Sequence, residues 1–172
     1  MKSHQKIRDM ILFAMLAALL FAAKVVFEAL PNIHPVGMLI MVYTVAYRSR
    51  ALIPLYLFII IFGLYYGFSI WWIPYVYIWA ILWAMTMLIP QNLPSKAKMI
   101  VYPIVCGLFG LLYGTFYAPA QAILFDYDFK TTIAWILSGL PFDALHGFGN
   151  LFMGMLVLPL SKVLLRLNKT KV

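Results

Sequence analysis

Apolar residues fall into long runs along this chain, separated by short segments rich in proline, asparagine or basic residues. Five of these runs cover residues 10–30, 33–47, 51–68, 71–89 and 99–124. A helix needs about 20 predominantly apolar residues to span a bilayer. The pattern therefore predicts one membrane-spanning helix in each run, the second being shorter than the others.

A sixth run follows the polar stretch of residues 126–132 and is too long for a single span. The triplet Gly139-Leu140-Pro141 is expected to interrupt it. We expect a short interfacial segment that ends at Leu137. A helix would follow with Pro141 in its first turn, which places Asp143 near the positive end of the helix dipole.

The composition supports a membrane protein. Of the 172 residues, 65% are apolar and 10% are charged, whereas soluble domains have about half and about a quarter. A soluble protein this short could not bury so much apolar surface. Aromatic residues at 17% and a single cysteine, Cys106, exclude a disordered chain and a disulfide scaffold. We therefore predict an all-α integral membrane protein, a bundle of six transmembrane helices that forms one domain over residues 1–172.

Most of the 13 basic residues fall on one side of a six-span arrangement. They are Lys2, Lys6, Arg8, Arg48, Arg50, Lys96, Lys98, Lys162, Arg166, Lys169 and Lys171. Cytoplasmic loops carry an excess of Lys and Arg, so both termini are expected in the cytosol. The net charge of +8 then reports topology rather than a nucleic-acid patch, because the charges lie on separate short loops. A cleavable signal peptide is an alternative, but its removal would leave an odd number of spans.

The remaining polar residues gather on the opposite, outer side. They are Lys24, Glu28, Asn32, His34, Asp143, His146 and Asn150. The last three lie at positions i, i+3 and i+7 of the last helix, on one face. Ionisable residues within a span usually face a partner or a wet cavity. We expect a polar cavity open to the outside, although an interfacial Lys24–Glu28 pair and a helix-capping Asp143 would explain each group separately.

Aromatic residues are dense around the outer loop between the third and fourth spans, in residues 62–79. Belts of Trp and Tyr occur at the interfaces of most membrane proteins. The density here exceeds what anchoring needs, and the segment of residues 67–74 could lay Trp71 and Trp72 over a ligand. Pockets of this kind are mostly apolar with a few placed polar groups.

Motifs of enzymes and channels are missing from the sequence. It has no Gly-rich phosphate loop, no His-Glu-x-x-His, no Asp-rich array and no nucleophile elbow. Charge ladders and filter-like repeats are also missing. The three histidines are scattered, which leaves zinc held by His146 and Asp143 as a minor alternative. We expect no catalytic residue and no metal site, and any transport must draw its energy from elsewhere.

The first span carries Ala14, Ala18 and Ala22 at positions i, i+4 and i+8. Small residues at this spacing form a smooth groove that lets another helix approach closely in lipid. Ordinary packing within the bundle is the alternative. Two successive Ala-x-x-x-Ala units on a terminal helix favour a docking face for a partner.

With Ala14-Met15-Leu16-Ala17-Ala18 in the first of six expected spans, the chain resembles the substrate-binding (S) components of energy-coupling factor (ECF) vitamin transporters. Residues 139–150, Gly-Leu-Pro-Phe-Asp-Ala-Leu-His-Gly-Phe-Gly-Asn, are similar to a signature near the last span of one large branch of that family. The similarity covers essentially the whole chain.

The resemblance implies a subunit that captures a water-soluble vitamin from outside, in the plasma membrane of a bacterium. It implies docking through the alanine face on a membrane scaffold protein bound to two cytosolic ATPases, and toppling of the subunit in the membrane. It also implies a pocket that contains Trp71, Trp72, Tyr75, Asp143, His146 and Asn150. With Lys24, Asn32 and His34 from the polar pattern, these residues form the expected site. The vitamin is the transported ligand, and no covalently bound cofactor is expected.

Vitamins taken up by this branch include cobalamin, pantothenate, folate and hydroxymethylpyrimidine. Lys24 is the one basic residue at the depth of the expected site, and Glu28 is placed to neutralise it. A polyanion would therefore lack basic partners. Cobalamin, with its amide- and methyl-bearing rim, ranks first, hydroxymethylpyrimidine second, and pantothenate would require Lys24. A stand-alone secondary transporter or channel is the main alternative function, and a membrane enzyme or assembly protein is a third.

Overall fold

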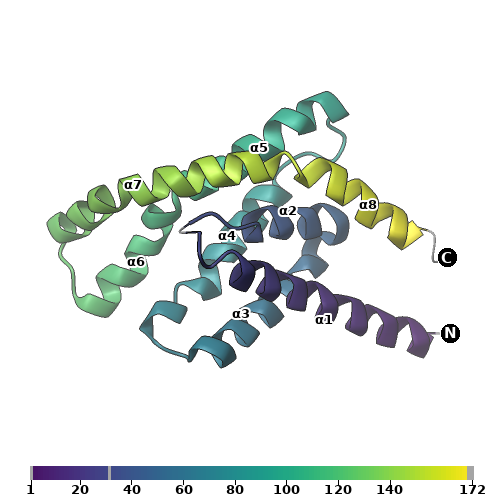
Figure 1. Ribbon diagram of the computed structural model, residues 1–172, viewed down its shortest axis with the longest axis horizontal. Helices are drawn as coiled ribbons and strands as arrows, with labels where there is room; N and C mark the ends of the chain where they lie inside the picture. The colour runs from purple at the N-terminus through teal and green to yellow at the C-terminus, as the bar shows by residue number, and fades with distance from the viewer. Residues whose placement is uncertain (1, 31, 170–172) are drawn as a thin grey trace.

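The computed structural model describes residues 2–30 and 32–169, and this part of the chain is helical without strands (Figure 1). The elements are α1 (Lys2–Val26), α2 (Val36–Tyr47), the 3-10 turn η1 (Arg48–Ala51), α3 (Leu52–Tyr66), η2 (Ile70–Trp72), α4 (Tyr75–Met87), α5 (Ser95–Leu111), α6 (Tyr113–Phe125), α7 (Phe129–Gly154) and α8 (Val157–Lys169). The predicted all-α class is confirmed.

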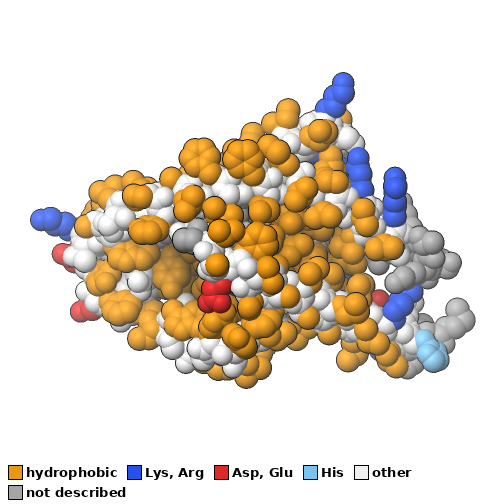
Figure 2. Space-filling view, viewed as in Figure 1, with side chains coloured by type: hydrophobic (Ala, Val, Ile, Leu, Met, Phe, Trp, Pro, Cys, Tyr) orange, Lys and Arg blue, Asp and Glu red, His pale blue; other side chains and the backbone are white. Residues whose placement is uncertain are grey.

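Several of these helices are long and apolar enough to cross a membrane. Within the described residues, four stretches meet that requirement: His4–Val26, Val36–Tyr66, Ile70–Met87 and Ser95–Phe125. The pair α7 and α8, bent by 48° at their junction, makes a fifth if it is counted as one span. Apolar side chains cover most of the face seen in Figure 2. The chain therefore has the helices of a membrane protein, with four or five candidate spans.

The helices α2 and α4 run parallel. His34, just before α2, packs its ring 6.2 Å from that of Trp79 in the first half of α4. At the other end of α2, the Arg48 guanidinium donates a hydrogen bond to the Met87 carbonyl where α4 ends (3.1 Å). Both ends of α2 thus meet the corresponding ends of α4.

The helix α3 runs antiparallel to α4. The Trp72 indole N–H, in η2 just before α4, donates to the Ile59 carbonyl (2.9 Å), and the Tyr56 hydroxyl donates to the Val76 carbonyl in the first turn of α4 (3.2 Å). Because α2 is parallel to α4 and α3 is antiparallel to it, the chain reverses direction at η1. The 31-residue apolar stretch Val36–Tyr66 is therefore folded back on itself.

The predicted break at Gly139-Leu140-Pro141 is wrong. The helix α7 continues through Pro141 and bends only after Gly154, so Asp143 lies near its middle and not in a first turn. Proline is tolerated inside membrane helices because packing against neighbours compensates for the lost hydrogen bond, and Pro103 and Pro119 also lie inside helices here.

The true start of α7 is capped by Asp128, whose carboxylate accepts a hydrogen bond from the Thr131 backbone N–H (2.7 Å). Hydrogen bonds from the side chain and the backbone of Thr131 lower the pKa of the Asp128 carboxyl from its ordinary value. Asp at this position is a preferred N-cap residue. The run expected over residues 99–124 also differs in detail, because it divides into α5 and α6 at Leu112.

Glycines bring the backbones of α5 and α7 together. A Cβ atom on Gly110 would lie 2.7 Å from the His146 carbonyl oxygen and 2.8 Å from Gly147 Cα. Further along the pair, a Cβ atom on Gly154 would lie 2.6 Å from Pro103 Cα. Small residues allow this close approach between membrane helices. This contact fixes how α7 is rotated about its own axis, and Asp143, His146 and Asn150 are buried in that orientation.

Basic side chains gather at one end of the molecule. The described ends of α1 and α8 lie at the same end, and Lys and Arg side chains gather there in the face seen in Figure 2. Asp9 of α1 pairs with Arg50 of η1 at this end (2.7 Å). Pro31, where the first run was expected to end, Lys171, and the side chains of Lys2 and Lys169 lie outside the described part.

Candidate functional site

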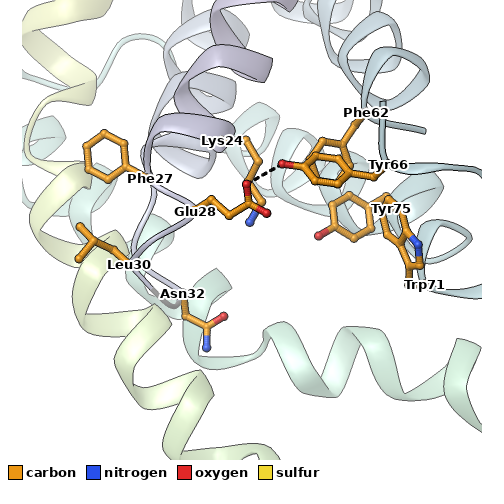
Figure 3. Close-up of a pocket in the computed structure, with 9 residues that line it drawn as sticks. All are labelled: Lys24, Phe27, Glu28, Leu30, Asn32, Phe62, Tyr66, Trp71 and Tyr75. Carbon is orange, nitrogen blue, oxygen red and sulfur yellow. Dashed lines mark hydrogen bonds between the residues drawn. The ribbon is translucent and has the colours of Figure 1, made fainter. Parts of the chain in front are cut away.

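A cavity of about 370 Å³ opens where α1 and α3 end and α4 begins, away from the basic end (Figure 3). Its lining consists of Lys24, Phe27, Glu28, Leu30, Asn32, Phe62, Tyr66, Trp71 and Tyr75. Four of the nine predicted site residues are among them: Lys24, Asn32, Trp71 and Tyr75. None of the nine predicted residues comes from α3, which contributes Phe62 and Tyr66 to the lining.

The polar side of this cavity comes from the end of α1. The Tyr66 hydroxyl donates a hydrogen bond to the Glu28 carboxylate (2.8 Å), the dashed line in Figure 3. Lys24 lies near enough to be attracted by Glu28, but the ion pairs within 4.0 Å among the described residues do not include the two. Glu28 is thus hydrogen-bonded to a tyrosine from α3, and Lys24 lines the cavity beyond ion-pair distance from it.

The opposite wall is a cluster of aromatic rings. Phe62 stacks on Tyr75 with centroids 5.5 Å apart and planes 23° apart. Trp71 stands edge-on to both, at 5.5 Å from Phe62 and 5.7 Å from Tyr75. Such packing gives a rigid wall onto which a flat or apolar ligand can fit.

Trp72 does not line this cavity. Its indole N–H is bound to the Ile59 carbonyl, and its ring packs edge-on against Phe68 at 5.0 Å. The turn η2 points adjacent side chains in different directions, so Trp71 faces the cavity and Trp72 faces α3. The prediction that both rings cover a ligand is not supported for Trp72.

A second cavity of about 270 Å³ lies between α6 and α7. It is lined by Asn32, Tyr113, Gly114, Tyr117, Trp135, Gly139, Phe142, Asp143 and His146. Asn32 belongs to both cavities, and its backbone is left-handed with φ 57°, which asparagine tolerates. The two cavities are therefore neighbours that share one amide side chain.

Asp143 is anchored to the start of α6. Both of its carboxylate oxygens accept from the Gly114 backbone N–H, at 3.0 and 3.1 Å. A Cβ atom at position 114 would collide with the same carboxylate. Glycine is required there by close approach, and the contact joins α6 to α7 beside the second cavity.

A buried polar cluster is formed by the rings of His34, Trp79 and His146 and by Asn150, which lies one helical turn after His146 on α7. The two imidazole rings meet edge-on at 5.3 Å, and each of the four side chains is at most 6% exposed. Five of their atoms make no hydrogen bond to the described protein: His34 Nδ1, Trp79 Nε1, His146 Nε2, Asn150 Nδ2 and Asn150 Oδ1. An unsatisfied buried donor or acceptor costs about 1–3 kcal/mol, and native proteins keep such groups rare. This concentration is typical of a site that binds something polar.

The structure thus distributes eight of the nine predicted residues over three neighbouring places, and Trp72 lies in none of them. Lys24, Trp71 and Tyr75 line the first cavity, Asp143 and His146 the second, and Asn32 both. His34 and Asn150 belong to the buried polar cluster. Sequence reasoning missed Tyr113, Tyr117 and Trp135, and it included Tyr66 only within the aromatic stretch of residues 62–79. The spacing Tyr113-x-x-x-Tyr117, one helical turn, was the available signal.

The three alanines predicted to dock a partner lie on one face of α1. Ala14, Ala18 and Ala22 are all exposed, whereas the adjacent Ala17 is fully buried. Beside Ala14, a groove of about 570 Å³ runs between α1 and α3, with Asp9 and Arg50 at its basic end. Within the described chain, the alanine face is not covered by another helix.

Compared with known proteins, the chain matches no family model, no curated sequence and no solved structure. In the part of the chain that the structure describes, no three His, Cys, Asp or Glu side chains are grouped to hold a metal ion. The site is therefore interpreted from its own geometry and from the sequence resemblance.

Proposed function

We propose that this chain is the vitamin-binding S component of an ECF-type importer in a bacterial plasma membrane. The observation that carries the proposal is the pair of neighbouring cavities at the end away from the basic residues. They combine aromatic walls with one cation, two acids and an amide, which suits capture of a small water-soluble solute. The exposed alanine face of α1 supports docking on a membrane scaffold that carries two cytosolic ATPases.

The proposed topology has six crossings with both termini in the cytosol. The reversal at η1 supports two passes within Val36–Tyr66, and α1, α4, the α5–α6 stretch and the bent α7–α8 pair supply the other four. Basic side chains gather at the end where α1 begins and α8 ends, which supports that end as cytosolic. The two cavities then face the outside.

The volumes of the cavities bear on the choice of vitamin. Cobalamin, a corrin macrocycle with a nucleotide tail, is several times larger than hydroxymethylpyrimidine or pantothenate. Cavities of about 370 and 270 Å³ lie near the lower end of the range for small-ligand pockets. They favour the two smaller vitamins over cobalamin, the first choice on residue chemistry alone.

Equilibrium binding to the purified chain tests this proposal. We expect one of hydroxymethylpyrimidine, pantothenate or cobalamin to bind and to raise thermal stability, by about 2.7 kcal/mol at 100 times its dissociation constant. Trp71→Ala should weaken that binding roughly tenfold to hundredfold, because a buried aromatic side chain contributes about 1.5–3 kcal/mol. Tyr127→Ala, at the same end but outside both linings, serves as the control. Failure of all three vitamins to bind would contradict the proposal.

A further inference from the structure

We infer that the buried polar cluster recognises an uncharged, amide-type edge on a small nitrogen heterocycle. The inference rests on the proposed function and narrows its ligand. Five unpaired polar atoms are concentrated on four side chains, His34, Trp79, His146 and Asn150, each nine-tenths or more buried. A ligand that hydrogen-bonded to these atoms would pair donors and acceptors that the described protein leaves without a partner.

The amide of Asn150 defines the complementary chemistry. Its Nδ2 donates and its Oδ1 accepts, and both are unpaired. The matching edge carries one acceptor beside one donor, as in a carboxamide, a lactam, or an amino group next to a ring nitrogen. Trp79 Nε1 can only donate, so it requires a further acceptor on the ligand. The imidazoles of His34 and His146 can each donate or accept.

The cluster contains no charged partner for a charged ligand group. Its members are two imidazoles, an indole and a carboxamide. The nearby ionisable side chains lie elsewhere: Lys24 lines the first cavity, and Asp143 is bound to the Gly114 N–H. The Lys24 ammonium is near enough to act electrostatically on His34 and His146, but it lines the first cavity. A carboxylate in the cluster would lose its hydration without a hydrogen-bonded cation beside it, and an ammonium there would also be repelled by Lys24. The cluster therefore selects for a neutral group.

We place the ligand in the second cavity, which adjoins the cluster at His146, although His34, Trp79 and Asn150 are not among its lining residues. His146 belongs to both the cluster and the cavity lining. Tyr117 stacks on Trp135 there, with centroids 6.0 Å apart and planes 24° apart, and Tyr113 meets the His146 ring edge-on at 4.9 Å. These rings suit a flat heterocycle, and about 270 Å³ accommodates a compound of one or two rings.

Binding of four probe compounds to the purified chain tests the inference. Two of the probes are uncharged and two carry a carboxylate. Hydroxymethylpyrimidine and nicotinamide carry the amide-type edge, whereas nicotinate has the nicotinamide ring with a carboxylate and pantothenate has a carboxylate without a ring. We expect the first two to bind and nicotinate to bind at least tenfold more weakly than nicotinamide. Asn150→Leu, which has a similar shape and no polar atoms, should weaken binding of the uncharged probes at least a hundredfold.

Asn150→Leu should also raise the melting temperature of the ligand-free protein, because it removes two unpaired buried atoms. Thr44→Val is the control: Thr44 is equally buried, but its hydroxyl donates to the Ile40 carbonyl at 2.7 Å, and its loss should leave binding unchanged. Trp79→Phe provides a second variant that removes the indole N–H. It should weaken binding in the same direction without loss of folded protein.

Three results would overturn the inference. A lower melting temperature for Asn150→Leu than for Thr44→Val would make Asn150 a satisfied part of the core. Binding of the carboxylates in preference to the uncharged probes, unaffected by Asn150→Leu or Trp79→Phe, would place recognition at Lys24 and leave the proposed function intact. Failure of all four probes to bind, together with failure of cobalamin, would contradict both the inference and the proposed function.

Discussion

Ala18→Trp is expected to abolish vitamin uptake by cells and to leave vitamin binding by the purified chain unchanged. Ala18 is exposed on the same face of α1 as Ala14 and Ala22, while the buried side of that turn is formed by Ala17 and Leu20. An indole at position 18 would therefore project outward without disturbing the core. It would hold a partner helix away from a surface whose close contact depends on small side chains.

The control for this variant is Leu19→Trp. Leu19 is 50% exposed and lies about 100° around the helix from Ala18, so an indole there should leave uptake close to that of the unmodified chain. Uptake and binding are measured in parallel, with radiolabelled vitamin in cells and with equilibrium binding in detergent. If Ala18→Trp lowers binding as much as uptake, the alanines serve packing within the chain and the docking proposal fails.

Gly110→Leu is expected to prevent the accumulation of folded protein. A Cβ atom at position 110 would meet the backbone of α7 at His146 and Gly147, within 2.7–2.8 Å, and backbone atoms cannot rotate out of the way. Overpacking typically costs about 1–3 kcal/mol for a few methylenes. Here the whole α5–α7 contact would have to open. The free energy of unfolding of a typical domain is only about 5–15 kcal/mol, so loss of this contact should leave little folded protein.

Gly139→Leu is the matched substitution. Position 139 lies in α7, the helix that Gly110 of α5 contacts, and a Cβ atom there has no neighbour within 4 Å. We expect this variant to give a monodisperse peak on size-exclusion chromatography, and Gly110→Leu to give aggregate or no protein. Equal yields of folded protein from the two variants would show that α5 and α7 are not held by close backbone contact.

Local sequence pattern predicted most of the helices and the helical face that carries Asp143, His146 and Asn150. Apolar runs with polar interruptions located most of the helices, because both signals act within a few residues. The spacing of Asp143, His146 and Asn150 placed them on one face of a helix, and all three are buried on α7. Helical periodicity is a property of the chain itself and does not depend on the neighbours.

The predictions that were wrong or incomplete concern features that depend on tertiary contacts. Pro141 signals a helix end locally, but contacts of α7 with α5 and α6 keep the helix continuous. The choice between Trp71 and Trp72 depends on the geometry of η2 against α3. Tyr66, which holds Glu28, and Tyr113, which meets His146, come from helices distant in sequence. A single sequence carries no direct signal for such pairings.

Co-purification decides whether this chain works as one subunit of an importer. The tagged chain would be purified in mild detergent from membranes of the cells that encode it, and each co-purifying subunit would be identified by mass and counted. We expect a complex with one membrane scaffold protein and two ATPase subunits, which is lost in Ala18→Trp and retained in Leu19→Trp. A chain that purifies alone from those membranes, and alone drives gradient-dependent uptake into liposomes, would contradict the account and favour a stand-alone secondary transporter.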